Sequence, residues 1–424
     1  MKILIKNGRV IDPANKVDAM VDILTEGSRI SRVAKGINER ADTVIDACAR
    51  IVMPGIVDMH VHLREPGRED KETIASGTRA AAKGGVTSVL AMPNTSPAID
   101  CAGSVALLKG IIHKTAAVNV FIVGAITLER QGKALTDIPK LKKEGIVAIS
   151  DDGASVDSDE LMLRALKEAK KAGVLVICHC EDKKLSAHGA VNLGIVSTRM
   201  GLRGISKESE YKRVQRDVDL AKKSGSCVHI AHISCSESVE IIASAKKKMI
   251  KVTAETAPHY FSLTEEAVLG FNTNLKMNPP LRESADLAAI RQGLADGTID
   301  VIASDHAPHT ENEKEIEFER AEFGVVGLET ELAVGITELI RNNVLNWSGL
   351  IEKMSFNPAK ILGITKGTLK TGADADLIVV NPDQEWVVQN ENFVSKSKNS
   401  AFLGKRLSGI VEYTICGGKI VYQL

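Results

Sequence analysis

The sequence predicts an α/β fold: a (β/α)8 TIM barrel joined to a small β-sandwich domain that both chain termini build. Three observations lead to this prediction. Eight short apolar runs of strand type are separated by helical patterns in the middle of the chain. Short runs of alternating apolar and polar residues occupy both ends. Histidine or aspartate stands at the ends of five of the eight central strands, where a barrel places its active site.

Both ends of the chain carry the alternation that is typical of strands with one buried face. At the N-terminus the runs cover residues 3–5, 21–24, 30–33 and 44–45, and at the C-terminus 375–380, 410–415 and 419–422. Neither end is large enough to fold alone, so we expect the two to pair. The predicted domains are a composite β-sandwich from 1–52 and 366–424, and a barrel over 53–365.

The middle of the chain repeats a strand followed by a helix. The expected strands are 55–61, 87–92, 120–125, 146–150, 174–178, 227–232, 251–255 and 300–304. Helical patterns rich in Ala, Lys, Glu and Leu lie between them, for example at 72–83, 158–171, 210–224 and 236–248. Eight such units in roughly 250 residues favour a closed barrel. A doubly wound open sheet would need a glycine fingerprint after the first strand, and a different motif stands there.

Composition excludes several classes of protein. The chain has 424 residues, a formal net charge of +0 and 3% aromatic residues, which argues against a nucleic-acid surface. No apolar run approaches the roughly 20 residues that span a bilayer. The N-terminus is typical of a strand and turn, and not of a secretory signal. Seven scattered cysteines fit a reducing compartment, so we expect a cytoplasmic protein.

The motif at the end of the first barrel strand is His60-x-His62-x-Arg64. Alternate residues of a strand point to one face, so all three side chains are expected to project the same way. Two imidazoles one strand step apart form half of a metal site, and a guanidinium beside them is suited to bind a carboxylate. His-x-His alone is a weak signal, and the added arginine sharpens it.

Four other strand ends carry similar donors. The fourth strand ends in Asp151-Asp152, the fifth in His179, the sixth in His232 and the eighth in Asp305. Each histidine alone is more typical of a buried core group than of a ligand. Five coincident strand ends in a chain with only ten histidines reverse that preference. Together they supply four histidines and two aspartates, enough for two metals, although pattern alone does not choose between the two adjacent aspartates.

The donor types suit zinc, and the sequence alone does not choose between zinc and another divalent ion. Neutral imidazole and carboxylate suit Zn²⁺, whose bound water has a pKa of about 7 instead of about 15.7. Asp305 ends the last strand over the barrel mouth, so it is the candidate to take and return a proton. His229 lies an odd number of residues before His232, so we expect it to face away and to be structural.

These residues resemble the amidohydrolase superfamily and, within it, bacterial dihydroorotases of the class that includes the Bacillus and Aquifex enzymes. The resemblance covers essentially the whole chain. Its motifs lie at 52–67, 91–95, 150–153, 179–182, 229–234, 255–260, 278–282, 304–309 and 357–359.

The resemblance implies roles for individual residues. The metal ligands would be His60, His62, Asp152, His179, His232 and Asp305, with Asp152 as the bridge between zinc ions, one or two per chain and two favoured. Arg64, Asn94 and His309 would hold the substrate carboxylate, and Asn278 would contact its amide edge. The implied activity is the reversible cyclisation of N-carbamoyl-L-aspartate to (S)-dihydroorotate in pyrimidine biosynthesis.

Two alternatives share this architecture. Hydantoinases and allantoinases usually carry a carbamylated lysine after the fourth strand, and residues 147–152 contain no lysine. Arg64 also favours a substrate with a carboxylate. The second alternative is a non-catalytic partner of aspartate carbamoyltransferase, which typically loses metal ligands that this chain keeps. The resemblance further implies a homodimer and a possible association with that transferase.

Residues 309–323 form a strongly charged segment after the last barrel strand. It is expected either to be a mobile loop that closes over the barrel mouth or to be a solvated helix. The sequence does not choose between the two.

Overall fold

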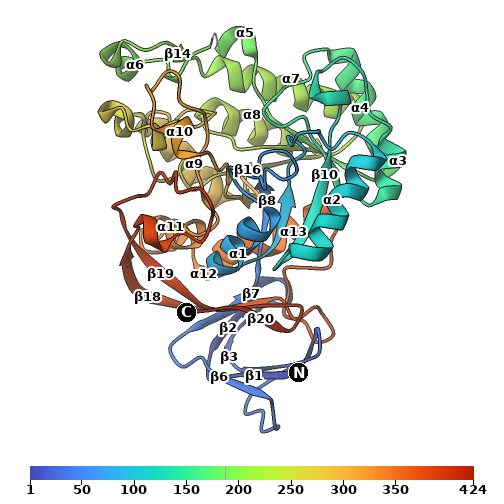
Figure 1. Ribbon diagram of the computed structural model, residues 1–424, viewed down its shortest axis with the longest axis vertical. Coiled ribbons are helices and arrows are strands. Elements are labelled where there is room, and N and C mark those ends of the chain that lie inside the picture. Colours follow the sequence, from blue (N-terminus) through green and yellow to red (C-terminus); the bar gives the residue numbers. More distant parts are fainter. Residues whose placement is uncertain (187) are drawn as a thin grey trace.

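A computed structural model describes residues 1–186 and 188–424 and shows a barrel standing on a β-sandwich (Figure 1). Both chain termini lie in the sandwich, at the lower end of the view. The barrel sheet has eight strands in the order β17-β16-β15-β12-β11-β10-β9-β8, and each neighbouring pair is parallel. A parallel bridge between Val61 and His306 joins the first strand to the chain that leaves the last one. The predicted (β/α)8 barrel is confirmed.

All eight expected barrel strands are present, most of them shorter than the sequence suggested. They are β8 (Ile56–Val61), β9 (Val86–Ala91), β10 (Asn119–Gly124), β11 (Ala148–Ile149), β12 (Leu175–Cys178), β15 (Val228–Ile230), β16 (Val252–Thr256) and β17 (Val301–Ile302). The strands are short because the chain leaves the ladder soon after each apolar run. The polar residues that follow are thereby free to turn over the barrel mouth.

Helices cover the outside of the barrel and return the chain between strands. They are α1 (Ile74–Gly84), α2 (Ala102–Thr115), α3 (Ile138–Glu144), α4 (Asp159–Ala172), α7 (Glu208–Ser224), α8 (Ser236–Lys247), α9 (Ser284–Asp296) and, after the last strand, α13 (Asn357–Leu362). Local sequence sets their ends. In α4, Ser158 accepts a hydrogen bond from the backbone N–H of Leu161, and Gly173 ends the helix with left-handed backbone.

Two excursions interrupt the regular alternation. The first, between β12 and α7, contains α5 (Lys183–Ser186), β13 (Val191–Asn192), α6 (Ile195–Met200) and β14 (Gly204–Ile205). The second follows β17 and contains α10 (Glu311–Lys314), α11 (Glu331–Gly335), η5 (Ile336–Ile340), α12 (Trp347–Ile351) and η6 (Glu352–Phe356).

The remaining short turns are η1 (Pro13–Asn15), η2 (Leu128–Arg130), η3 (Glu265–Gly270), η4 (Thr273–Leu275) and η7 (Asn390–Asn392). Within residues 1–186 and 188–424, no helix has the length and apolar character to cross a membrane.

The sandwich combines strands from both ends of the chain, as expected. One sheet has the order β5-β4-β1-β6, and the other has the order β20-β19-β18-β7-β2-β3. The N-terminal strands are β1 (Lys2–Lys6), β2 (Arg9–Asp12), β3 (Val17–Met20), β4 (Asp22–Glu26), β5 (Arg29–Ala34), β6 (Thr43–Asp46) and β7 (Ile51–Pro54). The C-terminal strands are β18 (Leu377–Val387), β19 (Arg406–Cys416) and β20 (Lys419–Gln423). Pairing of β7 with β18 ties the two ends together.

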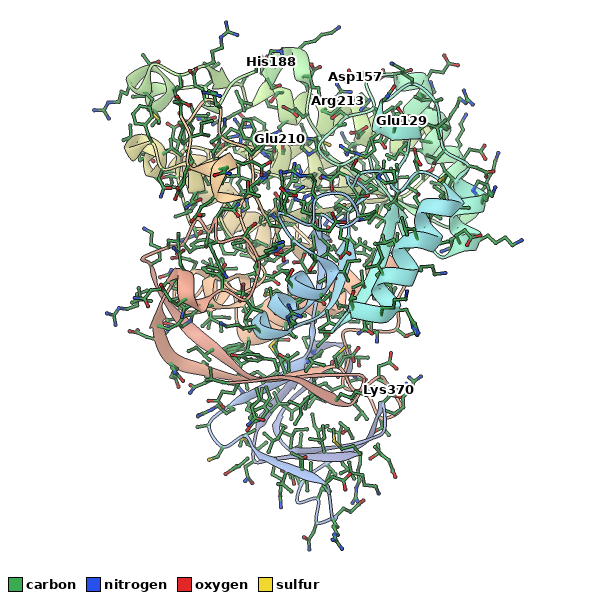
Figure 2. The ribbon with its side chains drawn as sticks, in the orientation of Figure 1. Glu129, Asp157, His188, Glu210, Arg213 and Lys370 are labelled. Atoms are coloured by element: carbon green, nitrogen blue, oxygen red, sulfur yellow. The ribbon has the colours of Figure 1, made fainter. Side chains whose placement is uncertain are left out.

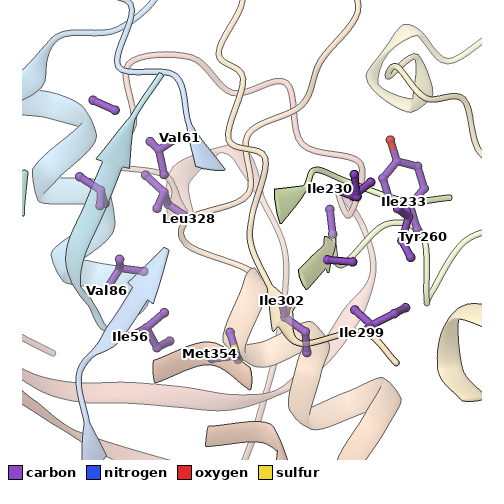
Figure 3. Close-up of a cluster of buried hydrophobic side chains, with 14 of the residues drawn as sticks. Ile56, Val61, Val86, Ile230, Ile233, Tyr260, Ile299, Ile302, Leu328 and Met354 are labelled. Atoms are coloured by element: carbon purple, nitrogen blue, oxygen red, sulfur yellow. The ribbon is translucent and has the colours of Figure 1, made fainter. Parts of the chain in front are cut away.

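The core has an outer and an inner part. Side chains such as Ile56, Val86 and Ile302 pack between the strands and the surrounding helices (Figure 3). A second cluster, which includes Val57, Met59, Val123, Ile177 and Val301, fills the inside of the barrel. Burying these apolar side chains holds the strand ends in fixed positions, and the site depends on that rigidity.

Candidate metal centre and substrate cavity

The six predicted donors converge at one end of the barrel. His60 is on β8, and His62 follows it after one residue. Asp152, His179, His232 and Asp305 come within a few residues of the ends of β11, β12, β15 and β17. All six side chains are buried. Strand ends that are far apart in sequence therefore bring these donors into one group. His113 and His188 lie exposed outside it.

Asp152 lies at the centre of the group. Its Oδ1 is 3.2 Å from His60 Nε2, 3.6 Å from His179 Nδ1 and 3.8 Å from His232 Nε2. Its Oδ2 is 3.5 Å from His62 Nε2. Burial raises the pKa of the Asp152 carboxyl, but the neighbouring histidines outweigh burial and place it well below its usual range.

Asp151 faces the other way. Its Oδ1 accepts hydrogen bonds from the backbone N–H groups of Ile126 and Thr127, at 2.8 Å and 3.0 Å, and its Oδ2 accepts one from the Thr127 hydroxyl. The geometry thus separates the two adjacent aspartates that the strand pattern left open. Asp152 enters the cluster, and Asp151 anchors the loop after β10.

The two histidines of the His-x-His motif are each fixed by a hydrogen bond on the nitrogen that faces away from the cluster. His60 Nδ1 lies 2.6 Å from Glu255 Oε1, and His62 Nδ1 lies 2.9 Å from Asn94 Oδ1. Because both partners are oxygens, each Nδ1 donates, and each Nε2 is left facing the cluster. The same contact turns the Asn94 Nδ2 amide group away from His62.

The donor set fits a divalent metal. His60 Nε2 and Asp152 Oδ1 are buried, and within the described part of the chain neither forms a hydrogen bond. Two groups of donor atoms each lie within 4.8 Å of one another: His60 with Asp152 and His232, and His60 with His62 and Asp305. Buried nitrogen and carboxylate donors that lack hydrogen-bond partners are the environment that a zinc-type ion satisfies.

Arg64 lies beside the donor cluster, but a loop and not strand alternation places it there. The strand β8 ends at Val61, and Arg64 lies in the following loop with left-handed backbone (φ 61°). Its Nε donates to the Pro308 carbonyl at 3.1 Å, and its Nη2 lies 3.3 Å from His309 Nε2. Burial lowers the pKa of Arg64 to about 10 against the opposing charges of Asp305 and Asp152. The guanidinium therefore stays charged beside the donors.

His309 is held in a defined tautomer next to Arg64. Lys71 Nζ lies 3.1 Å from His309 Nδ1, and an ammonium group can only donate, so Nδ1 accepts. The proton is then on Nε2, which donates to the Phe323 carbonyl at 2.8 Å. Burial and the charges of Arg64 and Lys71 lower the pKa of His309 to about 2. His309 is thus a neutral donor beside the arginine.

One cavity of about 470 Å³ contains most of these groups. His62, Asp152, His179, His232 and Asp305 line one part, and all four residues assigned to the substrate by resemblance line it too: Arg64, Asn94, Asn278 and His309. Asn278 Nδ2 donates to Glu181 Oε2 at 3.2 Å. The structure therefore brings the donors and the polar side chains to the same space.

Sequence reasoning missed four contributors to this site. Glu255 orients His60, Lys71 orients His309, and Arg130 and Phe323 line the cavity. Glu255 had a detectable signal, because it is the carboxylate at the end of the seventh expected strand. Arg130 had none, because it lies in a loop without a motif.

The expectation for His229 was wrong in one respect. His229 Nε2 lies 3.1 Å from Glu255 Oε2, so the side chain faces the same buried network as His60 instead of the opposite side. Left-handed backbone at His232 (φ 32°) breaks the alternation between the two residues. His229 contacts Glu255 and Thr253, and among the described contacts it touches none of the six donors.

The charged segment after β17 forms part of the cavity wall. Only Glu311–Lys314 is helical, and Phe318 and Ala321 are buried. The Lys276 ammonium donates to the carbonyls of Phe318, Glu319 and Ala321. The solvated-helix alternative is therefore wrong for most of the segment, and its motion as a lid stays a prediction.

A barrel with metal-type donors at its carboxyl-terminal rim and a composite β-sandwich defines the class of amidohydrolases. The family model described as "Amidohydrolase family" matches residues 327–422, and the one described as "Dihydro-orotase-like" matches residues 49–238. The protein called dihydroorotase from Elusimicrobium minutum is 52% identical over 420 residues, covering 99% of this chain and 97% of that one. The dihydroorotase from Geotalea daltonii is 52% identical over 427 residues and covers 100% of both chains. This chain belongs to the dihydroorotase family.

Solved structures support the fold. The L-hydantoinase from Arthrobacter aurescens superposes with a TM-score of 0.90 at 25% identity, covering 99% of this chain and 96% of that one. A D-hydantoinase gives a TM-score of 0.88 at 24% identity and covers 100% of this chain and 95% of that one. These likenesses concern the architecture and leave the choice of substrate to the residues in the cavity.

Proposed function

We propose that this chain is a dihydroorotase, which interconverts N-carbamoyl-L-aspartate and (S)-dihydroorotate plus water in the third step of de novo pyrimidine biosynthesis. One observation carries the proposal. The Arg64 guanidinium and the Asn94 side chain line the same cavity as Asp152 and Asp305. A cyclic amide that bears a carboxylate needs that combination, whereas a plain hydantoin or dihydropyrimidine ring would leave the partly buried arginine unpaired.

The proposed cofactor is Zn²⁺, with one or two ions per chain and two favoured. The residues that would hold it are His60, His62, Asp152, His179, His232 and Asp305. The central place of Asp152 among four histidines supports its role as a shared ligand, as in the aspartate-bridged class of the Bacillus and Aquifex enzymes. When bound, zinc supplies a Lewis acid that polarises a carbonyl group and makes water acidic near neutral pH.

The chain's own residues then orient the substrate and move one proton. Arg64, Asn94 and His309 hold the carboxylate, which fixes the ring carbonyl that faces the donor cluster. Asn278 contacts the amide edge of the ring. In hydrolysis, Asp305 takes a proton from the attacking water and delivers it to the ring nitrogen as the carbon–nitrogen bond breaks. In cyclisation the same proton moves in the opposite direction.

The direct test compares substrates with the purified chain. We expect turnover of dihydroorotate, and of carbamoyl-aspartate in the reverse direction, with little turnover of dihydrouracil or allantoin. A neutral ring has no carboxylate and leaves Arg64 unpaired. We therefore expect kcat/KM for these rings to be lower than for dihydroorotate by about 10²-fold or more. Faster turnover of dihydrouracil or allantoin than of dihydroorotate would show a hydantoinase or allantoinase instead.

The same assay addresses the non-catalytic alternative. All six donors are present and face one another, which supports an active site in this chain. We expect turnover from the chain alone. Activity seen only after addition of aspartate carbamoyltransferase would indicate an enzyme that depends on its partner, and no activity in either case would indicate a scaffold.

We further propose a homodimer in the cytoplasm, with a possible association with aspartate carbamoyltransferase. The proposed domain boundaries are 1–52 with 366–424 for the sandwich and 53–365 for the barrel. Size-exclusion chromatography with light scattering measures whether the chain is a homodimer. The same measurement with added transferase shows whether the two proteins associate.

A further inference from the structure

The loop after β10 carries an arginine that none of the steps above uses. Arg130 and the preceding Glu129 both have left-handed backbone, with φ of 57° and 53°. Such a conformation is strained for a residue with a side chain, and it persists where the surroundings or a function require it. In Figure 2, Lys370 marks the end of the molecule that holds the sandwich, and Glu129 lies at the opposite end. The strained pair is therefore at the end of the barrel that carries the site.

The guanidinium of Arg130 enters the substrate cavity. It lines that cavity together with Arg64 and Asn94. A Cβ placed on Gly153 would lie 3.7 Å from Arg130 Nη2 and 3.9 Å from Asn94 Nδ2. Both nitrogens thus border one small region above Gly153, and the Asn94 amide presents donors there because its oxygen is taken by His62.

No partner within the described residues explains this placement. Arg130 Nε is buried without a hydrogen-bond partner, and no carboxylate of the described chain lies within ion-pair distance of the guanidinium. Asp152 and Asp151 are the neighbouring acids; Asp152 lies in the donor cluster, and the oxygens of Asp151 are engaged by Ile126 and Thr127. Burial lowers the pKa of Arg130, with Asp152 and Asp151 opposing. A structural arginine would normally have its donors satisfied.

The barrel topology places Arg130 symmetrically to Arg64. Asn94 follows β9, Arg64 follows the neighbouring strand β8, and Arg130 follows the neighbouring strand β10 on the other side. Arg64 Nε is already bonded to the Pro308 carbonyl. A carboxylate accepts about four hydrogen bonds spread over its two oxygens, so a donor on the side of Asn94 away from Arg64 can be accommodated as well.

We propose that Arg130 is a substrate-binding residue that contacts the carboxylate of the ring from the side of Asn94 opposite to Arg64. The inference rests on the proposed dihydroorotase function and extends its substrate site to a second guanidinium. Two arginines that share one carboxylate would further favour substrates that carry this group over neutral rings.

The test replaces Arg130 with methionine, which keeps the length of the side chain and removes its charge and donors. We expect KM for dihydroorotate to rise about 10- to 100-fold, while kcat changes far less. Calorimetry should show the same loss of affinity for orotate, a ring with the carboxylate, and none for uracil, a ring without it. Lys133→Met is the matched control, because it removes the same charge from an exposed position in the same loop, and it should stay within about twofold of wild type.

Several outcomes would overturn the inference. KM for dihydroorotate and affinity for orotate that both equal those of wild type would show that Arg130 does not bind the carboxylate. An equal loss of affinity for orotate and uracil would show a general structural effect. If the methionine variant does not fold, Arg130→Lys serves instead, and its KM should still rise because a lysine cannot donate in the paired geometry. If wild-type protein binds orotate but does not turn over dihydroorotate, the proposed function fails. The affinities of wild type and Arg130→Met for orotate and uracil would still show whether Arg130 binds the carboxylate.

Discussion

Replacing Asp305 with asparagine is expected to lower kcat for dihydroorotate by about 10²- to 10⁴-fold. The carboxyl group lies in the donor cluster, with Oδ1 at 3.4 Å from His62 Nε2 and 3.6 Å from His60 Nε2. An amide of the same shape cannot take the proton from water and return it to the ring nitrogen. Affinity for orotate should change little, because the groups assigned to the carboxylate remain.

Two controls accompany this variant. Elemental analysis must show that the asparagine variant keeps its metal, so that lost turnover reports proton transfer and not an empty site. Asp157→Asn removes an aspartate at the same end of the barrel whose side chain is 68% exposed, and it should keep wild-type turnover. A value of kcat within about tenfold of wild type for Asp305→Asn would contradict the proton-transfer role.

Replacing Arg64 with methionine is expected to raise KM for dihydroorotate about 30- to 1000-fold, which corresponds to about 2–4 kcal/mol of binding free energy. The arginine lies beside His309 and Asn94 in the cavity, and the carboxylate of the substrate would lose its strongest partner. The preference for dihydroorotate over dihydrouracil should narrow, since the discrimination depends on this charge. Steady-state kinetics with both substrates measures the change.

The matched control for Arg64 is Arg79→Met, which removes an arginine from an exposed position on α1. It should leave KM within about twofold of wild type. If Arg64→Met also keeps a near-normal KM, the carboxylate is bound elsewhere and the choice of dihydroorotate over neutral rings loses its basis. A fall in kcat at unchanged KM would equally contradict the role of Arg64 in binding the carboxylate.

Much of the fold could be predicted because it depends on periodic patterns. The eight apolar runs gave the barrel, and the alternation at both ends gave the composite sandwich. The convergence of His60, His179, His232 and Asp305 followed from topology, because parallel strands present their carboxyl ends at one rim. Strand lengths were less predictable, since hydrogen bonding between neighbours decides where each ladder stops.

The finer parts of the site depend on backbone conformations that no periodic pattern encodes. Arg64, Arg130, His232 and Asp305 all have positive φ, so their side chains do not follow strand alternation. For this reason the expected orientation of His229 was wrong. For the same reason, Arg64 is directed toward His60 and His62 by the loop after β8 and not by strand alternation. Hydrogen bonds such as the one that His60 donates to Glu255 and the one that Lys71 donates to His309 join distant segments, and only the folded chain reveals them.

A zinc titration of the metal-free chain is the sharpest test of the proposed metal site. The chain is stripped with a chelator, zinc is added back in measured amounts, and dihydroorotate hydrolysis is followed at each ratio. The proposed site predicts negligible turnover without metal and a rise that saturates near two zinc ions per chain. Full turnover by the metal-free chain would contradict it, as would tight zinc binding that restores no hydrolysis.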